Sequence, residues 1–129
     1  MTYAAVADAP ERQSRQSVQM AISNEMVRIY KTHFGRGPTK ARTDFASPDL
    51  IDCTIQESFT HAERGMVAMG EHLRLSELRM FFQRAAATEF REEVERITGR
   101  KVWAFVSGTD TERDVSTEVF YLDPPSSEV

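Results

Sequence analysis

GRGPTKART, residues 35–43, separates two kinds of hydrophobic pattern and so decides where the chain changes from helix to strand. Before it, apolar side chains recur every three or four residues, at Val18, Ile22, Met26 and Ile29. That spacing predicts an amphipathic helix over residues 14–34. Gly35 is suited to end this helix, because glycine readily adopts the left-handed conformation of a helix C-terminus. The alternation that follows, Ala41, Thr43 and Phe45 between charged residues, predicts a strand.

The glycines and basic side chains of this stretch also resemble a phosphate-binding loop. In a P-loop, however, a strand leads through GxxxxGK[ST] into a helix, whose N-terminal amides face the phosphates. Here a helix ends and a strand begins, and the C-terminal end of a helix has a negative partial charge. We therefore favour a structural role for this stretch. The alternative hypothesis is a small-anion or nucleotide-binding sensor that uses Arg36, Lys40 and Arg42.

A second strand is predicted over residues 51–56, where apolar and polar side chains again alternate. Ser47-Pro48-Asp49 has the composition of a tight turn, so the two strands should form a hairpin. With Ala46 facing Leu50, all apolar partners share one face: Phe45 with Ile51, Thr43 with Cys53, and Ala41 with Ile55. Asp44 then opposes Asp52 on the other face, where Arg42 would relieve their repulsion.

The second half of the chain repeats this organisation. Thr60 and Glu63 form a capping-box pattern, which predicts a short helix that starts there. A longer helix is predicted to end at Gly99, from an apolar stripe that consists of Leu78, Phe82, Ala86, Phe90, Val94 and Ile97. Two further strands are predicted over residues 102–106 and 115–122.

These elements have the order αββαββ and predict an α+β fold. We expect two long helices packed on one face of an antiparallel four-stranded sheet, with a short extra helix before the second long one. The chain has 129 residues, a length typical of one domain. We predict a flexible N-terminal tail over residues 1–13, a single domain over residues 14–123 and a C-terminal tail over residues 124–129.

Composition limits the classes of function. The formal net charge of −4 argues against broad binding of nucleic acid or anionic membranes. No segment is long and apolar enough to span a bilayer. The three histidines lack a metal-binding spacing, and Cys53 follows the apolar alternation as a buried, inert thiol would. We predict no catalytic constellation, no metal and no cofactor, and only an active site assembled from distant residues stays open.

The third predicted strand has apolar residues on both faces. Strict alternation places Val102, Ala104 and Val106 on one face, and Trp103 and Phe105 on the other. Helices on one side of the sheet leave the second face uncovered, and exposed large aromatic residues mark interfaces. We therefore predict a homodimer whose interface includes Trp103, Phe105 and Phe81, the last lying beside the main stripe of its helix. The alternative is that the second long helix or a terminal segment crosses this face.

Several stretches resemble one bacterial family. They are NEMVRIYKTHFGRGPTKART from residue 24, THAERGM from residue 60, FFQRAAATEFREEVERITGRKVWAFVS from residue 81 and EVFYLDP from residue 118. Together they are similar to the MpsC family, long described as a domain of unknown function. Its label refers to a sodium-translocating, membrane-potential-generating system. The resemblance covers residues 17–123.

The resemblance to the MpsC family implies an association with a membrane ion or bicarbonate transport system. It implies no catalytic or substrate-binding residue. We therefore expect a non-enzymatic accessory or regulatory protein that self-associates and contacts a membrane transport complex. Its expected location is the cytoplasm, peripheral to the inner face of the membrane.

Overall fold

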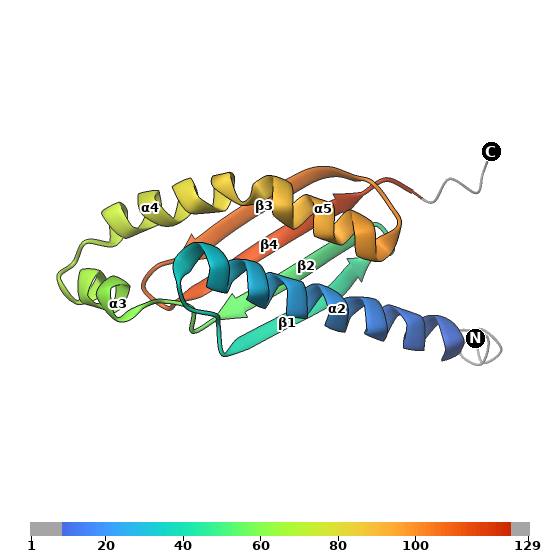
Figure 1. Ribbon diagram of the computed structural model, residues 1–129, viewed down its shortest axis with the longest axis horizontal. Coiled ribbons are helices and arrows are strands. Elements are labelled where there is room, and N and C mark those ends of the chain that lie inside the picture. The colour runs from blue at the N-terminus through green and yellow to red at the C-terminus, as the bar shows by residue number, and fades with distance from the viewer. Residues whose placement is uncertain (1–8, 125–129) are drawn as a thin grey trace.

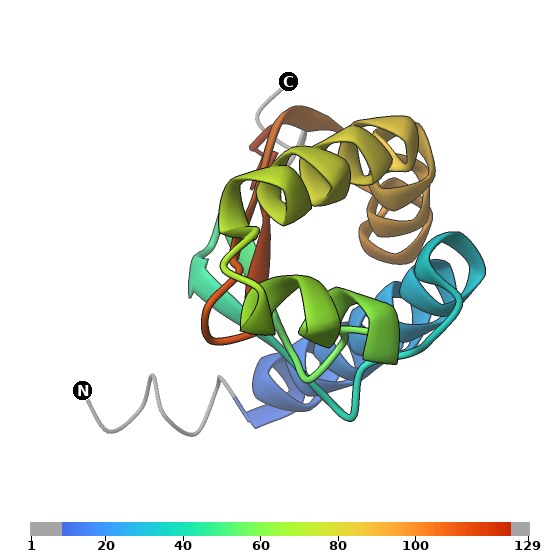
Figure 2. The same cartoon turned by 90° about the vertical axis from the view of Figure 1, so that its left-hand side faces the viewer.

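The computed structural model describes the backbone over residues 9–124 and the side chains over residues 14–124. Within this range, four helices lie on one side of a four-stranded antiparallel sheet (Figures 1 and 2), which confirms the α+β class. The helices are α2 (Ala9–Phe34), α3 (His61–Ala68), α4 (His72–Ala85) and α5 (Ala87–Thr98). The strands are β1 (Lys40–Ser47), β2 (Leu50–Gln56), β3 (Val102–Asp110) and β4 (Val115–Leu122).

Two elements extend further than the sequence pattern indicates. Helix α2 begins at Ala9, so it includes part of the predicted N-terminal tail, and β3 continues to Asp110. The remainder of that tail, residues 1–8, lies outside the described residues. The same holds for the predicted C-terminal tail beyond Pro124.

The sheet has the order β1-β2-β4-β3, so β1 and β3 form its edges. The predicted register of the first hairpin is confirmed: Phe45 pairs with Ile51, Thr43 with Cys53, and Ala41 with Ile55. Only the turn differs, because Leu50 pairs with Ser47 rather than with Ala46 after a shift in register. The alternation of apolar residues therefore determined which side of both strands faces the helices.

The core lies between the sheet and the helices. Helix α2 and strand β2 contribute Ile22, Met26, Ile29, Tyr30, Ile51, Cys53 and Ile55, and α5 and β4 contribute Phe90, Val94, Phe120 and Leu122. Burial raises the pKa of the Cys53 thiol to about 12. The prediction of a buried thiol is thus confirmed, and this thiol stays protonated at neutral pH.

The predicted second long helix is divided into α4 and α5 at Ala86, where the backbone has φ −90° and ψ −4°. The expectation of one continuous helix is therefore corrected. Helix α4 also buries a different face from the predicted one, with Leu75, Arg79 and Gln83 inside and Leu78 40% exposed. Two of those three buried side chains are polar, so a hydrophobic pattern could not reveal this face.

A β-bulge in β3 changes which side chains face the core. The register shifts between Val102 and Ala104, so Trp103 is the extra residue. Beyond the bulge, Phe105 pairs with Phe120, and their ring centroids lie 4.9 Å apart on the helix side. Trp103 is 62% exposed on the opposite face. The strict alternation that placed Trp103 and Phe105 on one face is therefore wrong.

Both predicted glycine helix ends are confirmed, since φ is +82° at Gly35 and +70° at Gly99.

A Cβ added to Gly99 would meet no atom within 4 Å, so alanine there introduces backbone strain without a clash. We expect Gly99→Ala to lower the free energy of unfolding by roughly 1–2 kcal/mol, measured by chemical denaturation. Gly65→Ala is the matched control, because Gly65 lies in α3 with equally open space and lacks a positive φ. Equal stability of Gly99→Ala and the parent protein would contradict the expectation.

Candidate functional site

A buried polar cluster lies between the sheet and helices α2 and α4. Its centre is Glu118 on β4, whose side chain is inaccessible to solvent. The Tyr30 hydroxyl donates a hydrogen bond to Glu118 Oε2, and Gln83 Nε2 donates to the same oxygen at 3.4 Å. Gln83 Nε2 also lies 3.1 Å from Thr109 Oγ1, which is 2.9 Å from Ser116 Oγ. We call Tyr30, Gln83, Ser107, Thr109, Ser116 and Glu118 the Glu118 cluster.

The cluster contains a carboxyl group that titrates near neutral pH. Burial raises the pKa of Glu118 to about 7, although the nearby Ser107, Tyr30 and Gln83 side chains favour the ionised form. Burial, together with the adjacent Glu118 charge, raises the pKa of Tyr30 well above its usual value, so its hydroxyl remains a donor. Glu118 is therefore able to hold or release a proton in the physiological range.

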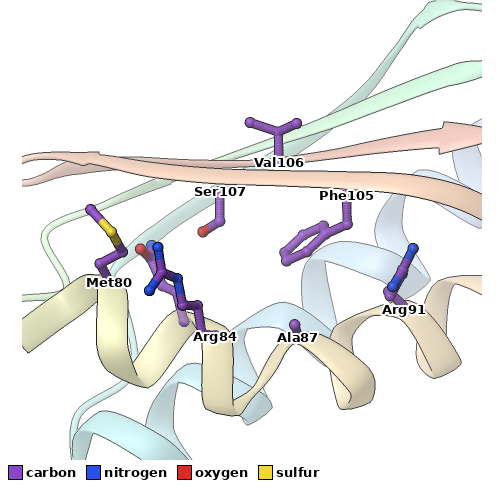
Figure 3. A pocket seen from close by; sticks show the side chains of 8 residues that line it. Met80, Arg84, Ala87, Arg91, Phe105, Val106 and Ser107 are labelled. Carbon is purple, nitrogen blue, oxygen red and sulfur yellow. The ribbon is translucent and has the colours of Figure 1, made fainter.

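A pocket of about 400 Å³ opens beside this cluster, between β3 and helices α4 and α5 (Figure 3). It is lined by Met80, Gln83, Arg84, Ala87, Arg91, Phe105, Val106 and Ser107. Gln83 and Ser107 belong to both the pocket and the cluster. Two buried oxygens, Ser107 Oγ and Glu118 Oε1, have no hydrogen bond within ordinary geometry, although their residues pair across β3 and β4. The cluster therefore has unused hydrogen-bonding capacity next to the pocket.

A second buried polar group, Arg79 on α4, has a structural role. Its guanidinium donates to both Glu63 carboxylate oxygens, at 2.8 and 2.6 Å, and to the Ser58 carbonyl oxygen at 3.1 Å. It also lies 4.0 Å from the Phe34 ring centroid and 4.7 Å from that of Phe59. These contacts pair the Arg79 charge inside the protein and hold α3 against α4.

Glu63 belongs to the same arrangement, since its side chain is buried beside Arg79. Its side chain accepts from the Thr60 backbone N–H at 2.9 Å, and the Thr60 hydroxyl accepts from the Glu63 N–H at 3.2 Å. The predicted capping box is thus confirmed. One carboxylate both starts helix α3 and balances the buried charge of Arg79.

The three basic residues proposed as an anion site have local partners. Arg36 donates to the backbone carbonyls of Glu57 and Phe59, and Lys40 Nζ lies 3.4 Å from the Glu57 carboxylate. Arg42 Nε lies 2.9 Å from Asp44. These contacts favour the structural role of the stretch from Gly35 onward, because Arg36 is bonded to backbone carbonyls and Lys40 and Arg42 are each paired with a carboxylate.

Arg42 is placed to reduce the repulsion between Asp44 and Asp52 on the helix-free face of the hairpin, as predicted. Asp44 pairs with Asp52 in the register, beside Arg42. Burial chiefly, and the Asp44 charge secondarily, raise the pKa of Asp52, while Arg42 opposes the shift.

The structure separates the three aromatic residues assigned to a dimer interface. Trp103 lies on the helix-free face of the sheet, 5.6 Å from the Tyr121 ring centroid. Phe105 faces the helices, and Phe81 is 65% exposed on α4. Of the three, only Trp103 is both exposed and on the uncovered face of the sheet.

Sequence reasoning missed the residues that form the pocket and the cluster. No local motif in the sequence marks Ser107, Ser116 or Glu118 as a site residue. One signal was present in β4, where Ser116 and Glu118 alternate in phase with the buried Phe120 and Leu122. A carboxylate in phase with core residues indicates a buried titratable group.

No helix between residues 9 and 124 combines the length and hydrophobicity needed to cross a membrane. Over the same residues, no three side chains of His, Cys, Asp or Glu are grouped as metal ligands.

Comparison with known proteins identifies a family. No curated protein and no solved structure matches the chain. Residues 14–124 match a family described as "Na+-translocating membrane potential-generating system (MpsC)". Because the match covers most of the 129 residues, the chain belongs to the MpsC family.

Proposed function

We propose that this protein is a non-enzymatic accessory or regulatory component of a sodium-translocating, membrane-potential-generating system, and that it acts as a homodimer. Family membership supports the association with that system. The proposed location is the cytoplasm, at the inner face of the membrane that contains the transport complex. The observation that carries the homodimer is an apolar surface on the uncovered face of the sheet.

This surface consists of Trp103, Val106, Val119 and Tyr121, and we call it the outer apolar face. Trp103 is 62% and Val106 56% exposed, and the other two side chains are half-buried. In the register of β3 and β4, Val106 is opposite Val119, and Tyr121 is next to the bulge at Trp103. The four side chains therefore form one continuous area, which no helix of the described residues covers (Figure 2).

A second copy of the chain is the occupant that fits this area best. The same sheet face becomes charged toward β1 and β2, where Arg42, Asp44 and Asp52 lie. An apolar area bordered by charged side chains has the organisation of a protein interface, with a water-free centre and a polar rim. A two-fold axis through the outer apolar face would bring equivalent aromatic residues together.

We expect Trp103→Ala to weaken dimerisation by about 30-fold or more, since the loss of a central aromatic anchor costs ~2 kcal/mol or more. Sedimentation equilibrium of the parent and the variant measures the change. Phe81→Ala is the matched control, because Phe81 is equally exposed but lies on α4. A parent protein that stays monomeric throughout the micromolar range would refute the homodimer. An equal effect of both substitutions would place the interface elsewhere.

The association with a transport system requires a separate experiment. Detergent-solubilised membranes of the native cell are passed over the immobilised protein. Subunits of a sodium-translocating complex should be retained on it and identified by mass spectrometry. The Trp103→Ala variant distinguishes recruitment through the dimer from recruitment through another surface. Recovery of only soluble proteins would contradict the proposed association.

A further inference from the structure

The pocket between β3 and helices α4 and α5 contains two arginines whose charges are not balanced locally. Elsewhere on the same helices, Arg74 lies 3.5 Å from Glu71 and Arg96 lies 2.7 Å from Glu93. Among the described residues, neither Arg84 nor Arg91 has a comparable ion-pair or side-chain hydrogen-bond partner, although both line the pocket. Arg84 is in the last turn of α4, where a cation also favours the helix dipole, but Arg91 has no such explanation.

The two guanidinium groups are positioned at opposite ends of the pocket. Figure 3 shows Arg84 beside Ser107 and Arg91 beyond Phe105, with both side chains directed from the helices toward β3. They stand on different helices, Arg84 on α4 and Arg91 on α5, on either side of the break at Ala86. Between them the lining is apolar, formed by Phe105 and Ala87 (Figure 3).

We propose that this pocket binds a short-chain dicarboxylate, with one carboxylate held by Arg84 and Ser107 and the other by Arg91. A planar carboxylate matches the fork of a guanidinium group and accepts two charge-assisted hydrogen bonds from it. The methylene chain lies against Phe105 and Ala87. A short chain keeps both carboxylates within a pocket of about 400 Å³.

Two buried oxygens behind the pocket, Ser107 Oγ and Glu118 Oε1, also favour a polar ligand there. Ser107 Oγ is buried and belongs to the pocket lining, and it makes no hydrogen bond of ordinary geometry, although it lies near enough to Glu118 to favour the ionised carboxyl. Glu118, fully buried on the adjacent strand, faces it across the ladder. When Glu118 is protonated, it is able to donate to Ser107 Oγ, which leaves the serine proton for the ligand carboxylate. When Glu118 is ionised, it competes for that proton and repels the ligand.

The affinity of the dicarboxylate should therefore fall as pH rises through about 7, because the pKa of Glu118 lies there. The groups that surround this carboxyl are Tyr30 from α2, Arg79 and Gln83 from α4, Cys53 from β2, Ser107 and Thr109 from β3, and Ser116 on its own strand. Burial raises the pKa values of Tyr30 and Cys53 well above neutrality, so neither accounts for a change near pH 7.

The test is a calorimetric titration of the full chain with succinate at about pH 6 and about pH 8. Arg84→Gln and Arg91→Gln should each weaken succinate binding by about tenfold or more, since each removes a charge-assisted contact. Arg74→Gln is the matched control on α4 and should leave the affinity unchanged, because Arg74 is paired with Glu71 outside the pocket. Glu118→Gln should bind succinate with little dependence on pH.

Three results would overturn the proposal. Absence of binding at millimolar succinate would rule out this dicarboxylate as a ligand. Equal binding of butyrate or inorganic phosphate would rule out recognition of two carboxylates at once. Equal losses in Arg74→Gln and Arg84→Gln would show attraction by general surface charge. Val106 on the edge strand β3 belongs both to the pocket lining and to the outer apolar face. Trp103 lies outside the pocket lining, and Arg84 and Arg91 lie on the helices, so the substitutions in the two tests are separate.

Discussion

Arg79→Ala will destabilise the protein by about 3–5 kcal/mol, the largest effect that we expect from a single substitution. Arg79 is fully buried, and its removal leaves the carboxylate of Glu63 with little access to water and without its charge partner. The substitution also removes the group between the rings of Phe34 and Phe59, so a cavity adds to the electrostatic cost. Urea denaturation monitored by circular dichroism measures the difference.

Arg74→Ala is the matched control for Arg79→Ala. Both arginines are on α4 and both have a glutamate partner, but the side chain of Arg74 is 77% exposed and its separation from Glu71 is 3.5 Å. An exposed pair of this kind contributes about 0–1 kcal/mol. If Arg79→Ala changed the stability as little as Arg74→Ala, the Arg79–Glu63 pair would not be the contact that stabilises the packing of α3 on α4.

The second large effect is a loss of stability as pH rises, caused by Glu118. The pKa of this carboxyl is about 7 in the folded protein, against a usual 4.5. Between these values the folded state binds more protons than the unfolded state, so the free energy of unfolding falls with rising pH. The contribution of Glu118 is fully present below about pH 4.5 and is lost by about pH 7, a change of ~3 kcal/mol.

Comparison of the parent protein with Glu118→Gln isolates this contribution. The variant lacks the ionisable group but retains an oxygen that accepts from the Tyr30 hydroxyl. Chemical denaturation at several pH values should show the parent losing stability relative to the variant between about pH 5 and about pH 8. Parallel stability curves for the two proteins would mean that Glu118 has an ordinary pKa and is hydrated.

The sequence predicted the local features of the fold well, because each is determined by neighbouring residues. The positive φ of Gly35 and Gly99, the Thr60–Glu63 capping box and the pairing of Thr43 with Cys53 follow from short-range chemistry and from side-chain alternation. A helix end, a cap and a hairpin register each depend on residues close in the chain.

The sequence was less informative wherever polar residues are buried or the ladder is irregular. The bulge at Trp103 reverses the alternation of β3, and no glycine or proline marks its position. Helix α4 buries Arg79 and Gln83, which a hydrophobic stripe assigns to solvent. In both cases the outcome depends on partners that are distant in the chain.

The candidate site shows the same division. By itself the sequence determined the α+β class, the helix ends at Gly35 and Gly99, the first hairpin and membership of the MpsC family, since these depend on local patterns. Only the tertiary structure placed Tyr30, Gln83 and Ser107 around Glu118 and put Arg84 and Arg91 at the two ends of one pocket. Tyr30 and Glu118 are 88 positions apart, and the pKa of a carboxyl depends on the burial that such distant segments create when they pack.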